Sequence, residues 1–147
     1  MNIQPDFEEL LQLLEENNID YMIVGGYAVA FHGYPRFTND LDVFYNLTGE
    51  NISKLQDILL KFGFNTEDIP INIFKERGAV LTFGVEPVRI DLLNDIDGIN
   101  FDQAKQNVVR GRYGKTEINF IGLNELIKNK TSTTRLKDKA DIEELKK

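Results

Sequence analysis

Two aspartates separated by one residue are the clearest chemical feature of this sequence. Asp40 and Asp42 stand in the run Asp-Leu-Asp-Val-Phe at residues 40–44, which alternates as a half-buried strand does. Because successive side chains of a strand point to opposite faces, both carboxylates project from one side and the apolar residues from the other. Paired carboxylates are oxygen ligands of the kind that a hard divalent cation prefers. The spacing therefore predicts a site for such a cation and for the phosphates that it carries.

The acids follow a short apolar run and a glycine pair. Residues 21–24 are Tyr-Met-Ile-Val, a stretch short enough for a buried strand. At Gly25 and Gly26, which come next, the backbone can turn tightly or lie close to a ligand. Two structural alternatives stay open: a simple strand-to-helix turn at the glycines, and a solvated strand face at Asp40 and Asp42.

A third acid lies in a predicted hairpin. Residues 79–83 and 88–93 form its arms and residues 84–87 its turn. In the second arm apolar residues alternate with Arg89 and Asp91. An acid in an apolar strand is costly to bury unpaired, so Asp91 is the natural third carboxylate. The alternative is that Asp91 only pairs with Arg89 or with another basic residue across the sheet.

The whole string resembles the signature of the nucleotidyltransferase superfamily typified by DNA polymerase β. It is most similar to the small bacterial branch that contains abortive-infection toxins and antibiotic nucleotidyltransferases. The forms Gly-Gly-x-Ala, His-Gly and Arg-x-Thr-x-Asp-apolar-Asp of that branch stand here at residues 25–28, 32–33 and 36–42. Lys130, followed by Arg-x-Lys-Asp at 135–138, is similar to a basic segment of the same branch.

This resemblance implies an α/β (α+β) fold in which helices flank a mixed, twisted sheet, as one domain over residues 1–147. It also implies Mg²⁺ (or Mn²⁺) as cofactor, an NTP as substrate, and a set of site residues. These are Asp40, Asp42 and Asp91 for the metal and catalysis, and Gly25, Gly26, Arg36, Lys130, Arg135 and Lys137 for the nucleotide. Asp91 would bind metal or act as general base.

Structural alternatives accompany several of these residues. Arg36 could hold its loop rather than meet a phosphate. Lys130, Arg135 and Lys137 could form a solvated helix end. His32 is expected to pack or to make a local hydrogen bond, without a catalytic role.

The function implied is transfer of a nucleoside monophosphate from an NTP to an acceptor, with release of pyrophosphate. The acceptor, whether protein, RNA or small molecule, stays open, and a toxin–antitoxin or phage-defence role is one version of this hypothesis. The alternative is a module that binds a nucleotide or a protein partner without turnover.

Composition limits the other classes. The 147 residues are 41% hydrophobic and 28% charged, as in ordinary soluble globular proteins. No cysteine is present, which excludes disulfides and thiolate metal sites and fits a cytoplasmic protein. The net charge of −7 argues against broad nucleic-acid binding. No apolar run is long enough to predict a membrane span, and no leader pattern is evident.

Periodicity predicts the remaining elements. Helices are expected over residues 5–17, 51–62, 123–130 and 136–146, with a short helix opening at residues 100–103. A second hairpin is expected around residues 113–114, and the alternating isoleucines at 69, 71 and 73 suggest a further strand.

Overall fold

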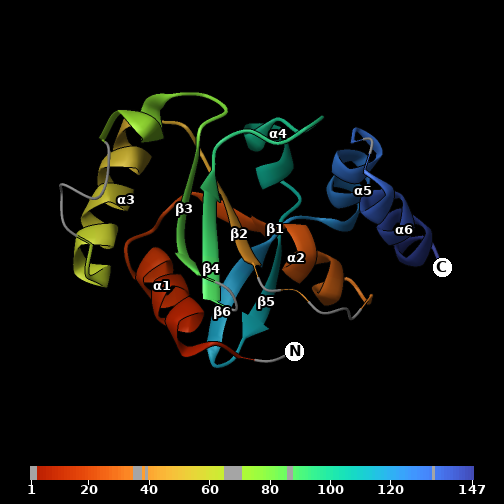
Figure 1. The fold of residues 1–147 in the computed structure, drawn as a ribbon, viewed down its shortest axis with the longest axis horizontal. Helices are drawn as coiled ribbons and strands as arrows, with labels where there is room; N and C mark the ends of the chain where they lie inside the picture. The colour runs from red at the N-terminus through yellow and green to blue at the C-terminus, as the bar shows by residue number, and fades with distance from the viewer. Residues whose placement is uncertain (1–2, 35–37, 39, 65–70, 86–87, 134) are drawn as a thin grey trace.

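The computed structural model describes residues 3–34, 38, 40–64, 71–85, 88–133 and 135–147. Within these residues the strands form one six-stranded sheet in the order β3-β4-β2-β1-β6-β5 (Figure 1). They are β1 (Tyr21–Val24), β2 (Asp40–Tyr45), β3 (Val80–Val85), β4 (Val88–Leu93), β5 (Val109–Tyr113) and β6 (Thr116–Phe120). The pairs β2–β4 and β1–β6 are parallel, and the other three pairs are antiparallel. The predicted mixed sheet is confirmed.

Helices flank this sheet on both sides. They are α1 (Pro5–Glu16), α2 (Gly25–Phe31), α3 (Gly49–Phe62), α4 (Phe101–Lys105), α5 (Leu123–Thr131) and α6 (Leu136–Leu145), with the 3₁₀ helix η2 (Ile71–Lys75). Figure 1 shows α1 and α3 on one side of the strands, and α2, α5 and α6 on the other. No helix in the described part of the chain is long and apolar enough to cross a membrane.

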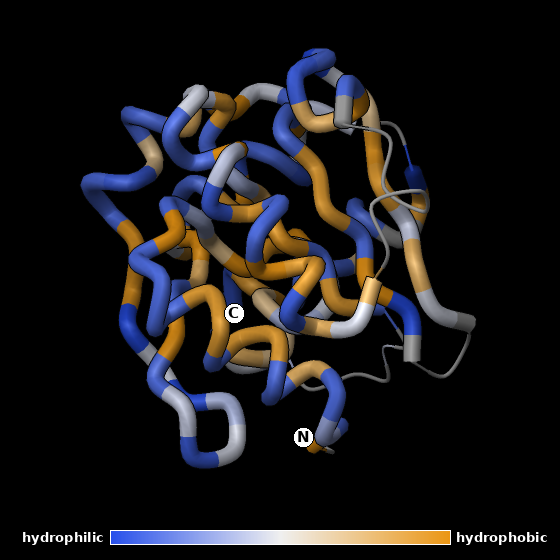
Figure 2. The backbone as a smooth tube through the Cα atoms, turned by 90° about the vertical axis from the view of Figure 1, so that its left-hand side faces the viewer, coloured by the Kyte–Doolittle hydropathy of each residue, from blue (hydrophilic) through white to orange (hydrophobic). Residues whose placement is uncertain are grey.

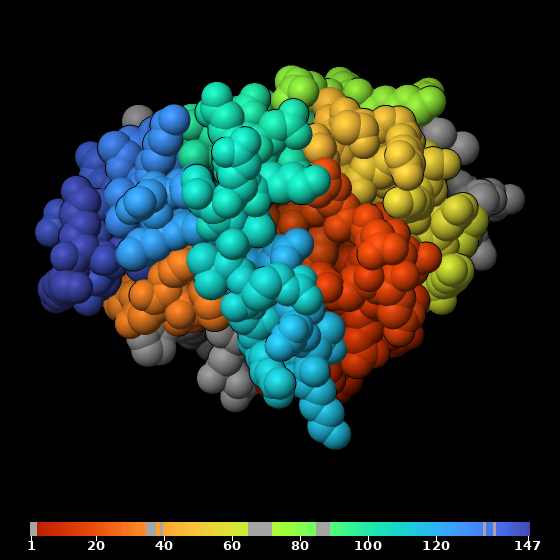
Figure 3. All heavy atoms as spheres, turned by 180° about the vertical axis from the view of Figure 1, so that it is seen from behind, coloured from red at the N-terminus to blue at the C-terminus, as the bar shows by residue number. Residues whose placement is uncertain are grey.

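Much of the core lies between the sheet and the α1–α3 layer, and Ala28 and Val29 of α2 belong to the same buried cluster. Phe7, Leu10 and Leu14 recur at helical spacing and are fully buried in α1, as expected of an amphipathic helix that covers a sheet. Leu55 and Leu59 do the same in α3. Figure 3 shows α1 beside α3 from behind the molecule, and Figure 2 shows hydrophobic segments through the middle of the backbone, with hydrophilic segments on many of its outer turns.

The ends of α3 follow from local chemistry. The Thr48 side chain accepts a hydrogen bond from the Asn51 backbone N–H, so the helix begins slightly before the predicted residue 51. Gly63, with φ +113°, ends it in the left-handed conformation, as predicted.

One predicted strand is wrong. Residues 71–75 form η2, so the alternation at residues 71 and 73 is not that of a strand; residue 69 lies outside the described residues. The contact that holds this segment is Phe74, which is fully buried with its ring 6.0 Å from that of Tyr45. A single 3₁₀ turn can bury one such anchor without a sheet partner.

Candidate active site

Three carboxylates and one guanidinium share a face of the sheet where β2 and β4 begin. In the parallel pairing of these strands, Asp42 lies opposite Asp91 and Asp40 lies opposite Arg89. Opposed residues of neighbouring strands project to the same face, so all four side chains stand on one surface. Leu41, which alternates with the acids, is buried at 1% exposure on the other face. The structure thus places on one face of the sheet the three acids singled out in the sequence.

Gly25 fits closely against one of these acids. It begins α2 directly after β1, with φ +69°, in the region that favours glycine. A Cβ atom added at this position would lie 2.1 Å from Oδ2 of Asp42. Glycine is therefore required twice over, for the turn and for the approach to the carboxylate. Gly26, which follows, is buried within α2.

Asp40 has a buried oxygen without a partner. Among the described residues no hydrogen bond reaches its Oδ1, although that atom is inaccessible to solvent. A buried, unsatisfied carboxylate oxygen is costly in a fold that offers it nothing. The negative charge of Asp40 also reaches α2. Burial, then neighbouring Tyr113, and least of all Asp40 raise the pKa of Tyr27.

Asp91 is engaged within the sheet. Its Oδ1 accepts a hydrogen bond of 2.6 Å from the Thr82 hydroxyl on β3. The same oxygen lies 3.4 Å from Nε of Arg89, and Oδ2 lies 3.5 Å from a terminal guanidinium nitrogen. The pairing with Arg89 that the sequence left open is therefore present.

These contacts decide how well the acids suit a cation. Within the described residues, no three acidic or histidine side chains are grouped as ready metal ligands, and Asp91 already has partners. Asp40, by contrast, offers an unsatisfied buried oxygen, and Gly25 leaves room at the Asp42 carboxylate. The carboxylates of Asp40 and Asp42 are hard oxygen donors of the kind that Mg²⁺ and Mn²⁺ prefer. The Asp40–Asp42 pair therefore fits a divalent cation.

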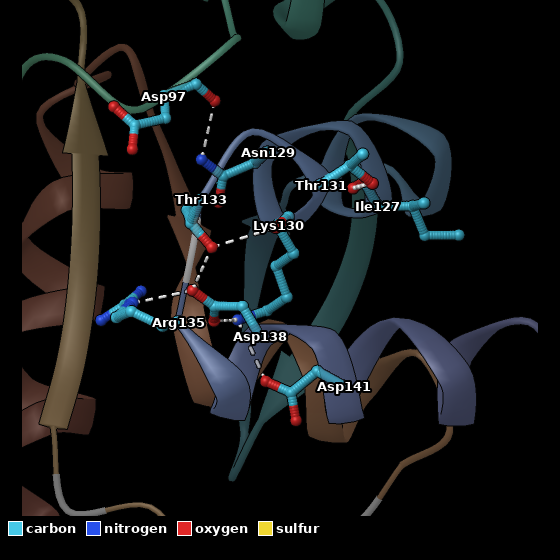
Figure 4. A network of polar contacts seen from close by, with 9 residues as sticks. All are labelled: Asp97, Ile127, Asn129, Lys130, Thr131, Thr133, Arg135, Asp138 and Asp141. Atoms are coloured by element: carbon cyan, nitrogen blue, oxygen red, sulfur yellow. Dashed lines mark hydrogen bonds and ion pairs between the residues drawn. The ribbon is translucent and has the colours of Figure 1, made fainter.

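Lys130 and Arg135 belong to a separate network between α5 and α6 (Figure 4). Lys130 is 4% exposed, and its Nζ lies 2.7 Å from Asp138 and 3.1 Å from Asp141. Arg135 and Thr133 bond the second oxygen of Asp138, at 2.7 and 2.6 Å. Figure 4 shows Lys130 and Arg135 reaching Asp138 from opposite sides. The ammonium of Lys130 is thus buried and paired rather than part of a solvated helix end.

The partners of Asp138 in this network determine the pKa of its carboxyl group. Burial alone would raise the pKa of Asp138, but hydrogen bonds from Lys130, Thr133 and Arg135, with the Lys130 charge, outweigh it and hold the pKa at about 2. The carboxylate is therefore ionised throughout the physiological range.

The other predicted residues are placed as follows. Arg36 lies outside the described residues. Lys137 belongs to the first turn of α6, and its side chain is not among those described. The Nε2 atom of His32 lies 2.6 Å from the carbonyl oxygen of Ile121, 89 residues further along the chain, so its hydrogen bond is not the local one expected.

Thr82 is absent from the sequence-based prediction, although the hairpin carries a signal for it. The observed register pairs Val85 with Val88 and Thr82 with Asp91. The prediction ended the first arm at residue 83, whereas β3 continues to Val85. A tighter turn would have placed the threonine opposite the acid.

A cavity of about 400 Å³ adjoins the other end of the same strands. Phe44 and Phe101 contribute to its lining, with their rings 5.0 Å apart. Its buried amide, Asn94, is committed internally, because it donates to the Tyr45 hydroxyl and to the Glu76 carbonyl at 3.0 Å each. The titratable cluster on β2 and β4 is the stronger candidate for chemistry.

Comparisons with known proteins identify the family and the fold of the chain. The family model described as "Nucleotidyl transferase of unknown function (DUF2204)" matches residues 4–147. No curated protein matches the chain in sequence.

Three solved structures share the fold. The lincosamide antibiotic adenylyltransferase LnuA, lincomycin-bound, is 17% identical with a TM-score of 0.58, covering 99% of this chain and 98% of that one. A candidate nucleotidyltransferase from Thermotoga maritima is 12% identical with a TM-score of 0.63, covering 99% and 93%. The antibiotic-resistance factor ANT(2'')-Ia is 14% identical with a TM-score of 0.58, covering 95% and 80%. The predicted nucleotidyltransferase fold is confirmed.

Proposed function

This chain belongs to the nucleotidyl transferase family whose model spans it, and we propose that it moves a nucleoside monophosphate from an NTP to an acceptor, with Asp40 and Asp42 holding the divalent cation. The observation that carries the proposal is the buried Oδ1 of Asp40, which has no hydrogen-bond partner among the described residues, beside the Asp42 carboxylate that lies against Gly25. A fold keeps such an unsatisfied acid where a ligand completes it.

The chemistry divides between the residues of this face. Bound Mg²⁺ or Mn²⁺ would neutralise the triphosphate and stabilise charge on the leaving pyrophosphate. The absence of a side chain at Gly25 and Gly26 lets the backbone approach the phosphates. Asp91 receives the proton of the acceptor hydroxyl as the hydroxyl oxygen attacks the α-phosphorus. The bond from that phosphorus to the bridging oxygen breaks, and pyrophosphate leaves.

The net charge of the protein limits which class of acceptor it favours. A net charge of −7 repels a polyanion such as RNA, so we favour a small molecule or a protein as acceptor. Lincosamide is the acceptor class named for one structural neighbour and belongs in the first panel tested. A toxin–antitoxin or phage-defence role corresponds to a protein acceptor. The cytoplasm, where NTP and Mg²⁺ are abundant, is the proposed compartment.

Labelled transfer tests the proposal. The protein is incubated with each α-labelled NTP, Mg²⁺ or Mn²⁺, and a panel of lincosamides, other antibiotics and cell proteins. Pyrophosphate and labelled products are then measured. We expect release that requires metal and is lost in Asp40→Asn. The matched control is Asp57→Asn, an acid exposed on α3, which should behave as wild type.

Two outcomes would contradict the proposal. Activity that survives in excess chelator removes the metal from the mechanism. Equal loss in the Asp40 and Asp57 variants removes the assigned site. Tight, metal-dependent NTP binding without any product under all conditions would favour the non-catalytic module instead.

A further inference from the structure

Thr82 is the side chain with the shortest hydrogen bond to Asp91 among the contacts described for that acid. It lies on β3, an edge strand of the sheet, directly opposite Asp91 in the antiparallel pairing. Its hydroxyl donates to Oδ1 of Asp91 at 2.6 Å, a length typical of a charge-assisted O–H···O⁻ bond. Thr82 itself is exposed, whereas Asp91 is only 9% exposed.

The contacts of Asp91 differ between its two oxygens. Oδ1 receives the Thr82 hydroxyl and faces Nε of Arg89 at 3.4 Å. Oδ2 has the weaker contact, at 3.5 Å from the Arg89 guanidinium. A carboxylate held through one oxygen has a fixed rotamer and leaves the other oxygen more available.

Packing alone does not account for this threonine. An exposed hydroxyl on an edge strand can bond to water at almost no cost, and the apolar side of the sheet is filled by Ile90 and Leu92 of β4, at 2% and 0% exposure. The Thr82 hydroxyl instead donates to Asp91 of β4, which shares a face of the sheet with Asp42.

We propose that Thr82 is a positioning residue for the reaction: its hydroxyl fixes Asp91 through Oδ1, so that Oδ2 takes the proton of the acceptor. This inference rests on the proposed function. Thr82 touches neither nucleotide nor acceptor in this scheme and acts only through Asp91. The step it serves is the movement of one proton from the acceptor oxygen to Asp91 as the new phosphorus–oxygen bond forms.

The test compares Thr82→Val, which keeps the shape and removes the hydroxyl, with Thr82→Ser, which keeps the hydroxyl. Thr116→Val, on β6, is the matched control. Pyrophosphate release is measured as kcat and KM for MgATP or whichever NTP wild type uses, across pH, together with melting temperature. We expect Thr82→Val to lower kcat about tenfold or more, with KM and melting temperature nearly unchanged and the acidic limb of the pH–rate profile displaced. Thr82→Ser should keep kcat within about threefold of wild type.

A double-mutant cycle separates positioning from general structural damage. In an Asp91→Asn background, Thr82→Val should cost nothing further. An additional loss there, or equal kcat for wild type and Thr82→Val, would overturn this inference while leaving the proposed function intact. Wild type that releases no pyrophosphate with any NTP would instead overturn the proposed function and this inference together.

Discussion

Replacing Lys130 with methionine should destabilise the protein strongly, because it removes the ammonium that two buried acids share. Lys130, Asp138 and Asp141 are 4%, 1% and 1% exposed. Methionine fills a similar volume, so the change removes the charge and little packing. Asp138 keeps Thr133 and Arg135 as partners, and Asp141 loses the ammonium at 3.1 Å.

The magnitude follows from the desolvation of an unpaired charge. Breaking a buried ion pair by removing one partner costs about 3–5 kcal/mol. Since whole domains are stable by roughly 5–15 kcal/mol, the variant should lose a third or more of its unfolding free energy. The exposed pair of Lys54 with Glu50 on α3, at 3.3 Å with 38% and 82% exposure, supplies the matched control. Lys54→Met should cost about 0.3–0.5 kcal/mol.

Urea unfolding followed by circular dichroism measures both variants in one experiment. A Lys130→Met protein within about 1 kcal/mol of wild type, at an unchanged m-value, would refute the assignment of a buried, structurally essential pair. A large loss in Lys54→Met would show instead that lysine replacement is damaging in general.

The same network predicts an acid dependence. The pKa of Asp138 is lowered from its ordinary 3.8 to about 2. A carboxyl with a depressed folded-state pKa contributes stability that is present above about pH 4 and is lost as pH falls through about 2. The difference of about 1.8 pH units corresponds to about 2 kcal/mol. In Asp138→Asn this part of the slope between pH 4 and 2 should disappear from urea titrations.

Three further predictions concern the nucleotide side. Gly25→Ala should lower the unfolding free energy by about 1–3 kcal/mol, because the new side chain would be strained at φ +69° and would clash with Oδ2 of Asp42. Urea titration should show a smaller loss for Gly63→Ala, because Gly63 also has a positive φ but has open space around it. Asp40→Asn should melt in chelator at or above the wild-type temperature, since its buried oxygen has no partner among the described residues, and should lose the rise that Mg²⁺ gives wild type; a clear drop in chelator would contradict this. Arg135→Gln, 70% exposed in its side chain, should fold and bind NTP more weakly in calorimetry, whereas an unchanged Kd would leave Arg135 with a structural role alone.

The fold was predictable where burial is periodic. The α1 helix follows from the spacing of Phe7, Leu10 and Leu14, and the common face of the acids follows from alternation along β2. Prediction failed over residues 71–75, because the adjacent residues Ile73 and Phe74, partly and fully buried, do not follow the alternation of a strand. It missed the contact of Thr82 because the register of a hairpin depends on the exact length of its turn.

The sequence alone could not distinguish an acid that stabilises the fold from an acid that binds a ligand, and the reason is different. Asp138 and Asp40 each stand near basic residues in the printed sequence, and composition treats them alike. In the structure Asp138 has three hydrogen-bonding partners, whereas Oδ1 of Asp40 is buried with none among the described residues. Folding alone explains the first, since Lys130 and Arg135 match the charge of Asp138 within the chain. It does not explain the second, because an unmatched buried oxygen only costs stability. What separates the two acids is their pairing in three dimensions, and that pairing favours Asp40, rather than the basic network of α5 and α6, as the place where a ligand completes the site.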